Sequence, residues 1–217
     1  MTSLRVMTYN VRQLRDDRAA VVTVLRECTP DVVALQEPPR GPFGRARLAA
    51  LARDAGLVPV VSGGGARTTA LLARPGLELT GARGMRQPWR VGRTRRGLAY
   101  ADLGGLRIVS VHLALAADER AGQVLRLLPV LASVPDCLVL GDLNEQPGGA
   151  SWRRLGQHLH DLAPGAGPTY PARAPRRRID AVLGSRGVTA TGARAPDGEA
   201  VARASDHRPV VVDVRWA

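Results

Sequence analysis

The sequence contains no lysine, although it is strongly basic. All 31 basic residues are arginines, against 19 acidic residues, and the formal net charge is +12. A charge of this size is typical of proteins that bind nucleic acid. The uniform use of arginine, together with abundant alanine, glycine and proline, also indicates GC-rich coding DNA. The charge therefore gives only mild support for a polyanionic partner.

Cysteine and long apolar runs are also scarce. Cys28 and Cys137 are too few for a disulfide scaffold, and we expect both thiols to be buried and inert. No stretch reaches the roughly 18 apolar residues that a membrane-spanning helix needs. Residues 1–10 lead directly into a predicted strand and lack the apolar core of a signal peptide. We therefore expect a cytoplasmic monomer.

The hydrophobic pattern predicts one α/β domain over residues 1–217, since 45% of the residues are hydrophobic and no change of composition divides the chain. Short runs of Val, Ile and Leu alternate with helical patterns. Strands are predicted at 4–11, 31–36, 57–61, 68–73, 77–82, 96–103, 106–112, 137–141, 178–183, 188–194 and 209–215. Helices are predicted at 16–28, 43–55, 117–132 and 149–158. This strand content indicates two packed sheets flanked by helices.

Several apolar segments end in polar residues of a kind used in catalysis. Asn10 closes the first predicted strand and Glu37 the second, and Asp142 and Asn144 follow the strand at 137–141. The run Ser205-Asp206-His207 directly precedes the last strand. Strand ends meet at a sheet edge, where an open site can form. Together these residues predict one metal-assisted hydrolytic site.

The order of these motifs resembles the endonuclease/exonuclease/phosphatase superfamily, the metal-dependent phosphoesterases similar to deoxyribonuclease I. The matching segments are TYNVR, VVALQE, VSVHL, LVLGDLNEQP, RRRIDAVL and ASDHRPVVVDV, which together reach from Asn10 to Asp213. GDLN and SDHRP are specific motifs, whereas TYN and LQE alone are weak. The resemblance implies a four-layer α/β/β/α sandwich of two mixed, mainly antiparallel sheets flanked by helices.

The resemblance also implies a Mg²⁺ or Mn²⁺ cofactor. A phosphodiester repels anionic nucleophiles, and a hard cation held by oxygen ligands neutralises that charge. We expect Glu37 to be the main metal ligand, with the amide oxygen of Asn10 assisting a metal-bound water. Asp206 is expected near the metal, either as a direct ligand or through water.

The remaining motif residues have expected catalytic roles. His207 is the expected general base for in-line attack of water at phosphorus, and Asp180, by resemblance, fixes its tautomer. Asp142 positions the water. Asn144 donates to a phosphate oxygen, and His112 contacts the phosphate or stabilises the leaving oxygen. The alternatives are an Asx-turn at Asp142 and Asn144, and a core histidine at His112.

Arginines beside these motifs are expected to contact the substrate. Arg176, Arg177 and Arg178 precede Asp180 directly and are predicted to bind flanking phosphates. Arg12 is a further predicted contact, and it occupies the place where the abasic-site repair branch usually has an aspartate. At this position the chain is similar to the pancreatic-type deoxyribonuclease and sphingomyelinase branches instead.

A second departure concerns the first histidine of the site. Pancreatic-type deoxyribonucleases pair that histidine with a glutamate just before a TTALLA-like strand, but the stretch ARTT at 66–69 has none. The orientation of His112 therefore stays open.

Three further features have simpler interpretations. His158 and His160 are expected at a solvated helix end, and Gly63 to Gly65 in a hairpin turn, although backbone N–H groups there can also cradle a phosphate. Arg93, Arg95 and Arg96 form a second basic cluster.

The predicted activity is hydrolysis of a phosphodiester in DNA or RNA. The alternatives are a phosphatase or sphingomyelinase-like phospholipid phosphodiesterase of the same superfamily, and a catalytically silent binding domain. Membrane-acting relatives usually present aromatic or apolar hairpins, whereas this chain has only seven aromatic residues. The complete set of motif residues argues against a silent domain.

Overall fold

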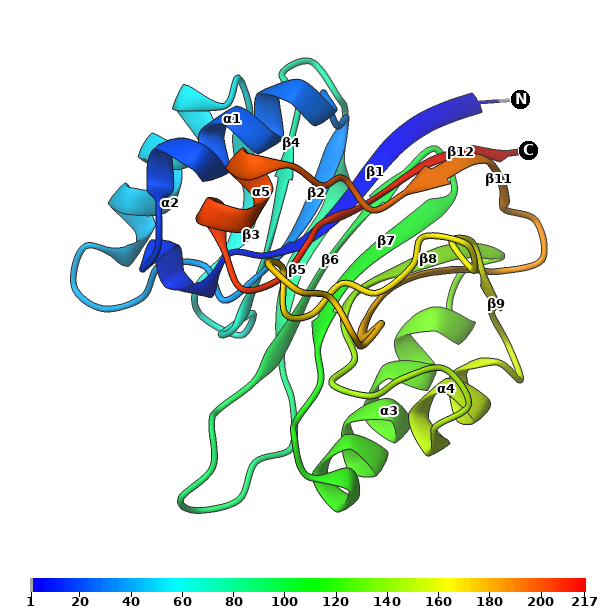
Figure 1. The fold of residues 1–217 in the computed structure, drawn as a ribbon. Helices are drawn as coiled ribbons and strands as arrows, with labels where there is room; N and C mark the ends of the chain where they lie inside the picture. Colours follow the sequence, from blue (N-terminus) through cyan, green and yellow to red (C-terminus); the bar gives the residue numbers. More distant parts are fainter. Residues whose placement is uncertain (1) are drawn as a thin grey trace.

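The computed structural model describes residues 2–217, and within them two six-stranded sheets pack face to face between helices (Figure 1). The first sheet has the order β11 (Thr189–Arg194), β12 (Val210–Trp216), β1 (Thr2–Asn10), β2 (Val32–Gln36), β4 (Thr69–Ala73), β3 (Val58–Ser62). The second has the order β5 (Thr80–Arg86), β6 (Gly97–Leu103), β7 (Leu106–His112), β8 (Asp136–Asp142), β10 (Asp180–Gly184), β9 (His160–Asp161). The predicted four-layer α/β/β/α sandwich is thus confirmed.

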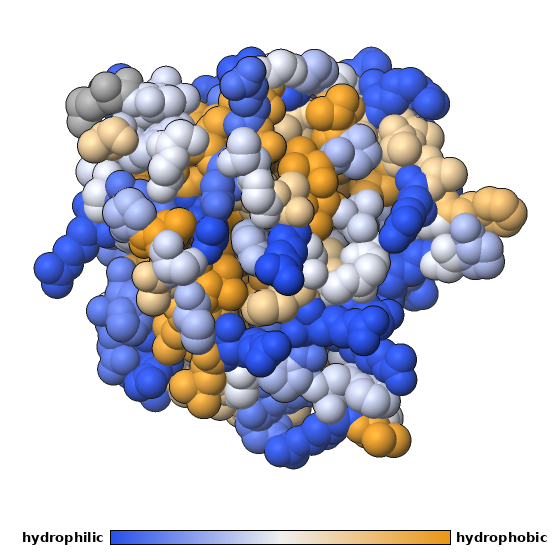
Figure 2. Space-filling model, turned by 180° about the vertical axis from the view of Figure 1, so that it is seen from behind, coloured by the Kyte–Doolittle hydropathy of each residue, from blue (hydrophilic) through white to orange (hydrophobic). Residues whose placement is uncertain are grey.

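Helices cover the outer faces of both sheets. The helices α1 (Arg18–Cys28), α2 (Gly44–Asp54) and α5 (Glu199–Ala204) pack on the first sheet, and α3 (Ala117–Ala132) and α4 (Ala150–Leu155) pack on the second (Figure 1). Seen from behind, hydrophilic side chains cover much of the surface, and apolar atoms are visible between them (Figure 2). None of the helices found between residues 2 and 217 is long and apolar enough to cross a membrane.

The central strands read as continuous apolar runs because both of their faces are buried. In β1, Val6 points into the core between the two sheets, whereas Met7 and Tyr9 pack under the helices. In β2, Val32 faces the inter-sheet core and Val33 faces the helices. A sheet buried on both sides shows no polar alternation, so the runs of Val, Ile and Leu predicted these strands well.

Each sheet contains one parallel strand pair, and these two pairs position the site. β1 and β2 run parallel, with Asn10 opposite Gln36, and β7 and β8 run parallel, with His112 opposite Asp142. The carboxyl ends of both pairs lie at the same edge of the sandwich. β10 begins at Asp180, which pairs with Asp142 in the antiparallel register.

Some predicted boundaries were wrong. The strand predicted at 77–82 is β5 at Thr80–Arg86, because Leu77 and Leu79 pack against the core without joining the ladder. The helix predicted at 149–158 ends at Leu155, just before Gly156. The helix α5, the single turn of 3-10 helix at Arg12–Leu14 and the two-residue strand β9 were missed, since periodicity needs longer segments.

Both cysteines are buried, as expected. Desolvation raises the pKa of Cys28, and it raises the pKa of Cys137 to about 11. Neither thiol is therefore a reactive thiolate at neutral pH.

Candidate active site

Asp142 is the centre of the candidate site and joins polar groups from both sheets. Its side chain is almost fully buried, at 1% exposed. Its Oδ1 accepts the backbone N–H of Asn144 at 2.8 Å, and its Oδ2 accepts Nδ2 of Asn10 at 3.2 Å. The same Oδ2 lies 3.4 Å from Nε2 of His112 and 3.8 Å from Nε2 of His207. One carboxylate oxygen thus faces three of the predicted site residues.

Asp180 and His207 form a buried pair beside it. Nδ1 of His207 lies 2.9 Å from Oδ2 of Asp180, and the same oxygen accepts the hydroxyl of Thr169 at 2.6 Å. Tyr170 packs against the imidazole, with the ring centroids 4.9 Å apart. Nδ1 is therefore the proton-bearing nitrogen toward Asp180, and Nε2 is directed at Asp142.

Burial and charge shift the titration of this cluster. Burial opposes ionisation of His207, but the charge and hydrogen bond of Asp180 outweigh it and raise the histidine's pKa to about 9. Desolvation, reinforced by the charge of Asp180, raises the pKa of Asp142 to about 6. Without metal, the surroundings therefore favour the imidazolium form of His207 and oppose ionisation of Asp142.

His112 has the opposite character. Burial, aided by the positive charges of Arg96 and His207, lowers its pKa well below the usual range, so its ring is neutral. Its Nε2 lies 3.4 Å from Oδ2 of Asp142. Its Nδ1 is buried and meets no partner at full hydrogen-bond geometry within residues 2–217, although the backbone of Thr68 is near enough to oppose part of the lowering. Asp142 and the backbone of Thr68 thus flank the ring, and no carboxylate on the strand side replaces the missing glutamate.

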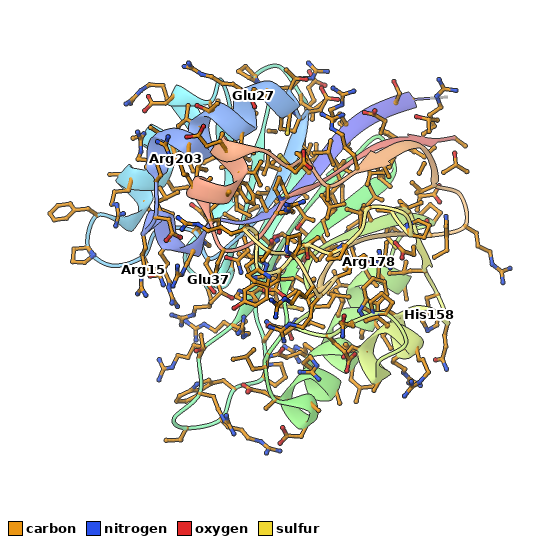
Figure 3. All side chains as sticks on the ribbon, viewed as in Figure 1. Arg15, Glu27, Glu37, His158, Arg178 and Arg203 are labelled. Atoms are coloured by element: carbon orange, nitrogen blue, oxygen red, sulfur yellow. The ribbon has the colours of Figure 1, made fainter. Side chains whose placement is uncertain are left out.

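The predicted metal residues gather around Arg12. Glu37 follows β2, and its backbone oxygen accepts the N–H of Gln13 at 2.7 Å. Oδ1 of Asn10 accepts the backbone N–H of Arg12 at 3.1 Å, and Nε of Arg12 lies 3.6 Å from Oδ2 of Asp206. Figure 3 shows Glu37 beside the crowded group of side chains between the sheets.

A divalent cation fits this donor set. The carboxylate of Glu37 forms no ion pair or hydrogen bond with any of residues 2–217, and its charge, like that of Asp206, acts on Arg12. Carboxylate and amide oxygens such as those of Glu37, Asp206 and Asn10 suit Mg²⁺ or Mn²⁺. Ligand atoms of Asp142, Asp180 and His207 also lie within 4.8 Å of one another. A cation at that second place would have to displace the proton shared by His207 and Asp180.

The backbone at this edge is strained. Left-handed φ angles occur at Arg12 (45°), Gln13 (58°) and Leu14 (57°), at Glu37 (49°) and at Asn144 (50°). Five of the seven non-glycine residues with positive φ in residues 2–217 thus lie at the site. Backbone strain of this kind concentrates where a fold fixes functional groups.

The predicted arginine contacts divide into two groups. Arg178 pairs with Asp161 at 2.5 Å, donates to the oxygen of Ala163 at 3.0 Å and covers Trp152. A substrate phosphate has to compete with these contacts, and the role of Arg178 in substrate binding stays a prediction. Arg177 stacks on Tyr170, and Arg176 is exposed beside it.

Arg12 is the remaining arginine that was predicted to contact the substrate, and it forms ion pairs with acidic neighbours. Its guanidinium group pairs with Asp16 at 3.0 Å, and it is half-exposed at the edge of the site. A substrate phosphate there has to compete with Asp16 and Asp206 for the same guanidinium.

Sequence reasoning missed two contributors from the loop before β10. Thr169 donates to Asp180, and Tyr170 packs on His207. This loop is fastened to the SDH motif, since Arg208 N–H donates to Thr169 and Ala172 N–H donates to Asp206, each at 2.7 Å. No local pattern signals these roles. His158 lies away from the site (Figure 3), and the H-x-H pair belongs to no group of metal ligands in the described chain.

Comparisons with known proteins give a consistent result. The profile of the Endonuclease/Exonuclease/phosphatase family matches residues 7–207. Similar solved structures include an endonuclease/exonuclease/phosphatase from Bacteroides vulgatus, with 16% identity, a TM-score of 0.82 and full coverage of both chains. No curated protein matches the sequence significantly.

Two further solved structures have a named activity or ligand. A mannosyl-6-phosphatase from Bacteroides thetaiotaomicron has 13% identity and a TM-score of 0.77, over 98% of this chain and 100% of that one. D. rerio TDP2 complexed with a single-strand DNA product has 18% identity and a TM-score of 0.73, over 99% and 100%. At these identities, the similarity shows a shared fold.

Proposed function

Because this chain belongs to the Endonuclease/Exonuclease/phosphatase family, whose members hydrolyse phosphoesters with divalent metal ions, we propose that it is a Mg²⁺- or Mn²⁺-dependent phosphodiesterase acting on DNA or RNA. The observation that carries this proposal is the buried chain of contacts from Thr169 through Asp180 and His207 to Asp142. Such a chain fixes one imidazole and one carboxylate toward the same point.

We assign the residues roles from their geometry and titration. Oδ2 of Asp142 accepts the amide of Asn10 and faces both histidines, and in this role it also receives a proton from the attacking water. His207, whose pKa is raised through Asp180, has Nε2 beside the same oxygen and donates to the phosphate. The motif suggested His207 as the base, and the carboxylate of Asp142, 3.8 Å from Nε2 of His207, is the alternative base.

Asn144 and His112 complete the pocket for the phosphate. The amide of Asn144 is held by its Nδ2 hydrogen bond to the oxygen of Leu113 at 2.8 Å. Neutral His112 places its Nε2–H beside Asp142, where it can donate to the leaving oxygen. Glu37, Asn10 and Asp206 are the proposed metal ligands, and the bound cation neutralises charge on the scissile phosphate.

A phosphatase is the second candidate. One similar fold belongs to a mannosyl-6-phosphatase and another to TDP2 with a DNA product, so the shape of the sandwich does not choose between a monoester and a diester. The net charge of +12 favours the polyanionic diester.

The testing experiment compares purified protein, with Mg²⁺, Mn²⁺ or EDTA, on bis-p-nitrophenyl phosphate, p-nitrophenyl phosphate, plasmid, single-stranded DNA, RNA, sphingomyelin and inositol phosphates. We expect metal-dependent cleavage of the diester and of a polynucleotide. Preference for the monoester would replace the proposal with the phosphatase, and cleavage of sphingomyelin alone would replace it with the lipid enzyme.

Glu37→Gln tests the metal assignment. The change keeps the shape of the side chain and removes its charge, so we expect a loss of at least ~10²-fold in kcat/KM across a Mg²⁺ titration. Glu27→Gln is the matched control, because Glu27 is exposed on α1 away from the site (Figure 3). Wild-type activity in the Glu37 variant would remove this residue from the metal site.

A further inference from the structure

A pocket of about 630 Å³ lies beside the end of β2, and its walls carry four arginines: Arg40, Arg45, Arg67 and Arg95. The walls come from the loop after Glu37, the start of α2, the glycine turn after β3 and the loop before β6. Within the described chain no acidic residue lines this pocket. We call it the arginine pocket.

The four guanidinium groups of the arginine pocket have no acidic partner. None of them forms an ion pair with any carboxylate of residues 2–217, whereas Arg107, for example, pairs with Asp102 at 2.7 Å. Like charges gathered in one hollow repel one another, and a bound anion relieves that repulsion.

Two of these arginines are held in place by their neighbours. Arg45 lies against Gly63, where an added Cβ would come within 2.9 Å of its Nε, and Gly63 has a φ of 66° that a side chain disfavours. Arg95 stacks on the ring of Trp89 at 4.3 Å. A guanidinium group that is oriented before binding loses less entropy when it meets a phosphate.

The arginine pocket connects to the catalytic centre through Arg96. Arg96 is 8% exposed and donates to the backbone oxygen of His112 at 3.3 Å. Together with Arg67 and Arg95 it lines a neighbouring hollow of about 270 Å³. Arg40 is close enough to the centre that its charge lowers the pKa of His112. Positive charge therefore continues from the candidate active site to the arginine pocket.

We propose that the arginine pocket is an anion subsite that binds a second phosphate group of the substrate while the scissile phosphate lies at Asp142 and His207. This inference rests on the proposed function and narrows it to substrates with two or more phosphates. A volume of about 630 Å³ accommodates a phosphate with part of the group attached to it. A neighbouring phosphate of a polynucleotide and a second phosphate of a small molecule present the same chemistry here.

The test uses two triple variants with the same change of net charge. Arg45→Gln, Arg67→Gln and Arg95→Gln together remove charge from the arginine pocket and leave Arg40, whose charge acts on His112, in place. The control combines three exposed, unpaired arginines outside the pocket: Arg126→Gln, Arg154→Gln and Arg186→Gln. Circular dichroism verifies that each variant is folded, and the single variant Arg95→Gln is measured in the same way.

Binding is measured in EDTA with two probes, a single-stranded dT 12-mer and inorganic pyrophosphate. If three phosphate contacts are lost, the slope of log Kd against log salt for the 12-mer falls by up to about 2 in the pocket variant. The control variant should change the slope by less than half as much. If the pocket variant has a smaller salt slope for the 12-mer but binds pyrophosphate normally, the ligand is a polynucleotide backbone. If it loses only the binding of pyrophosphate, the ligand is a small polyphosphorylated molecule.

Cleavage separates this inference from the proposed function. We expect the ratio of kcat/KM for the 12-mer to kcat/KM for bis-p-nitrophenyl phosphate to fall at least tenfold in the pocket variant relative to the control. Equal salt slopes, equal pyrophosphate affinity and equal ratios in the two variants would overturn the subsite and leave the phosphodiesterase intact. A wild-type protein that binds both probes but cleaves no ester would retain the subsite and refute the proposed function.

Discussion

Asp180→Asn isolates the electrostatic role of one buried carboxylate. Oδ2 of Asp180 lies 2.9 Å from Nδ1 of His207, and its charge raises the pKa of His207 and of Asp142. Asparagine has nearly the same shape but carries no charge. The variant therefore leaves the burial of His207 in place and removes the interaction that overcomes it.

The size of the effect follows from the pKa of His207. Its rise from 6.5 to about 9 is about 2.5 units, or about 3 kcal/mol in favour of the imidazolium after the cost of burial. Without Asp180, burial opposes the charge with only Asp142 and Asp206 to offset it. We expect the pKa of His207 to fall by at least ~2 units, and that of Asp142 to fall as well.

The raised pKa of His207 also makes the free energy of unfolding depend on pH, and the direction of this dependence follows from the direction of the shift. Because the folded pKa of His207 is raised, its stabilising contribution is complete below pH 6.5 and is lost as the pH rises through about 9. Asp142, with a pKa of about 6, is already ionised across most of this window and changes little there. Asp180→Asn should therefore lower the free energy of unfolding most near pH 6.5, and the difference should close toward pH 10.

The assay combines histidine NMR with urea unfolding of the metal-free protein in EDTA. The chain has four histidines, so the imidazole signals can be assigned by substitution. Asp118→Asn, a change at an exposed carboxylate, is the control and should leave the titration of His207 unchanged. A His207 that still titrates near pH 9 in the Asp180 variant would refute the assigned coupling, as would a stability loss that is independent of pH.

Four further outcomes are expected. Thr169→Val removes a buried donor and should lower the free energy of unfolding by ~1–3 kcal/mol in urea, whereas Thr169→Ser should retain most of it. Gly141→Ala places a Cβ 2.0 Å from a backbone oxygen of β7 and should cost more than ~3 kcal/mol or prevent folding. Gly122→Ala, inside α3 with no atom within 4 Å, should stabilise by ~1 kcal/mol, and both are read by thermal denaturation. Replacing Arg176 and Arg177 by Gln should reduce the salt slope of Kd for single-stranded DNA by ~1 unit, and an unchanged slope would exclude them as phosphate contacts.

The residues of the candidate site were predictable because each terminates or begins a strand. Asn10, Glu37 and His112 follow runs of Val, Ile and Leu that are buried on both faces, and such runs are visible without an alignment. These motifs also indicated the family and the sandwich fold, and both predictions are confirmed. The catalytic and metal-binding roles of these residues stay predictions that the variants above test.

Features that depend on contacts between loops were not predictable. The ion pair of Arg178 with Asp161 was not visible in the sequence. The glycine turn at Gly63 was expected as a hairpin, with a phosphate cradle as the alternative, and it forms one wall of the arginine pocket with Arg45. In each case the partner lies on a segment that no periodicity relates to the residue.

The sequence by itself determined the layers of the fold and which polar side chains reach the edge of each sheet, because strands buried on both faces are continuous apolar runs and helices have a period of 3.6 residues. Only the tertiary structure decided how these edges meet. Asn10 and Asp142 are 132 positions apart in the chain and come within 3.2 Å because the two sheets pack face to face. The raised pKa values follow from the packing, since desolvation raises that of Asp142 and the charge of Asp180 raises that of His207 against desolvation.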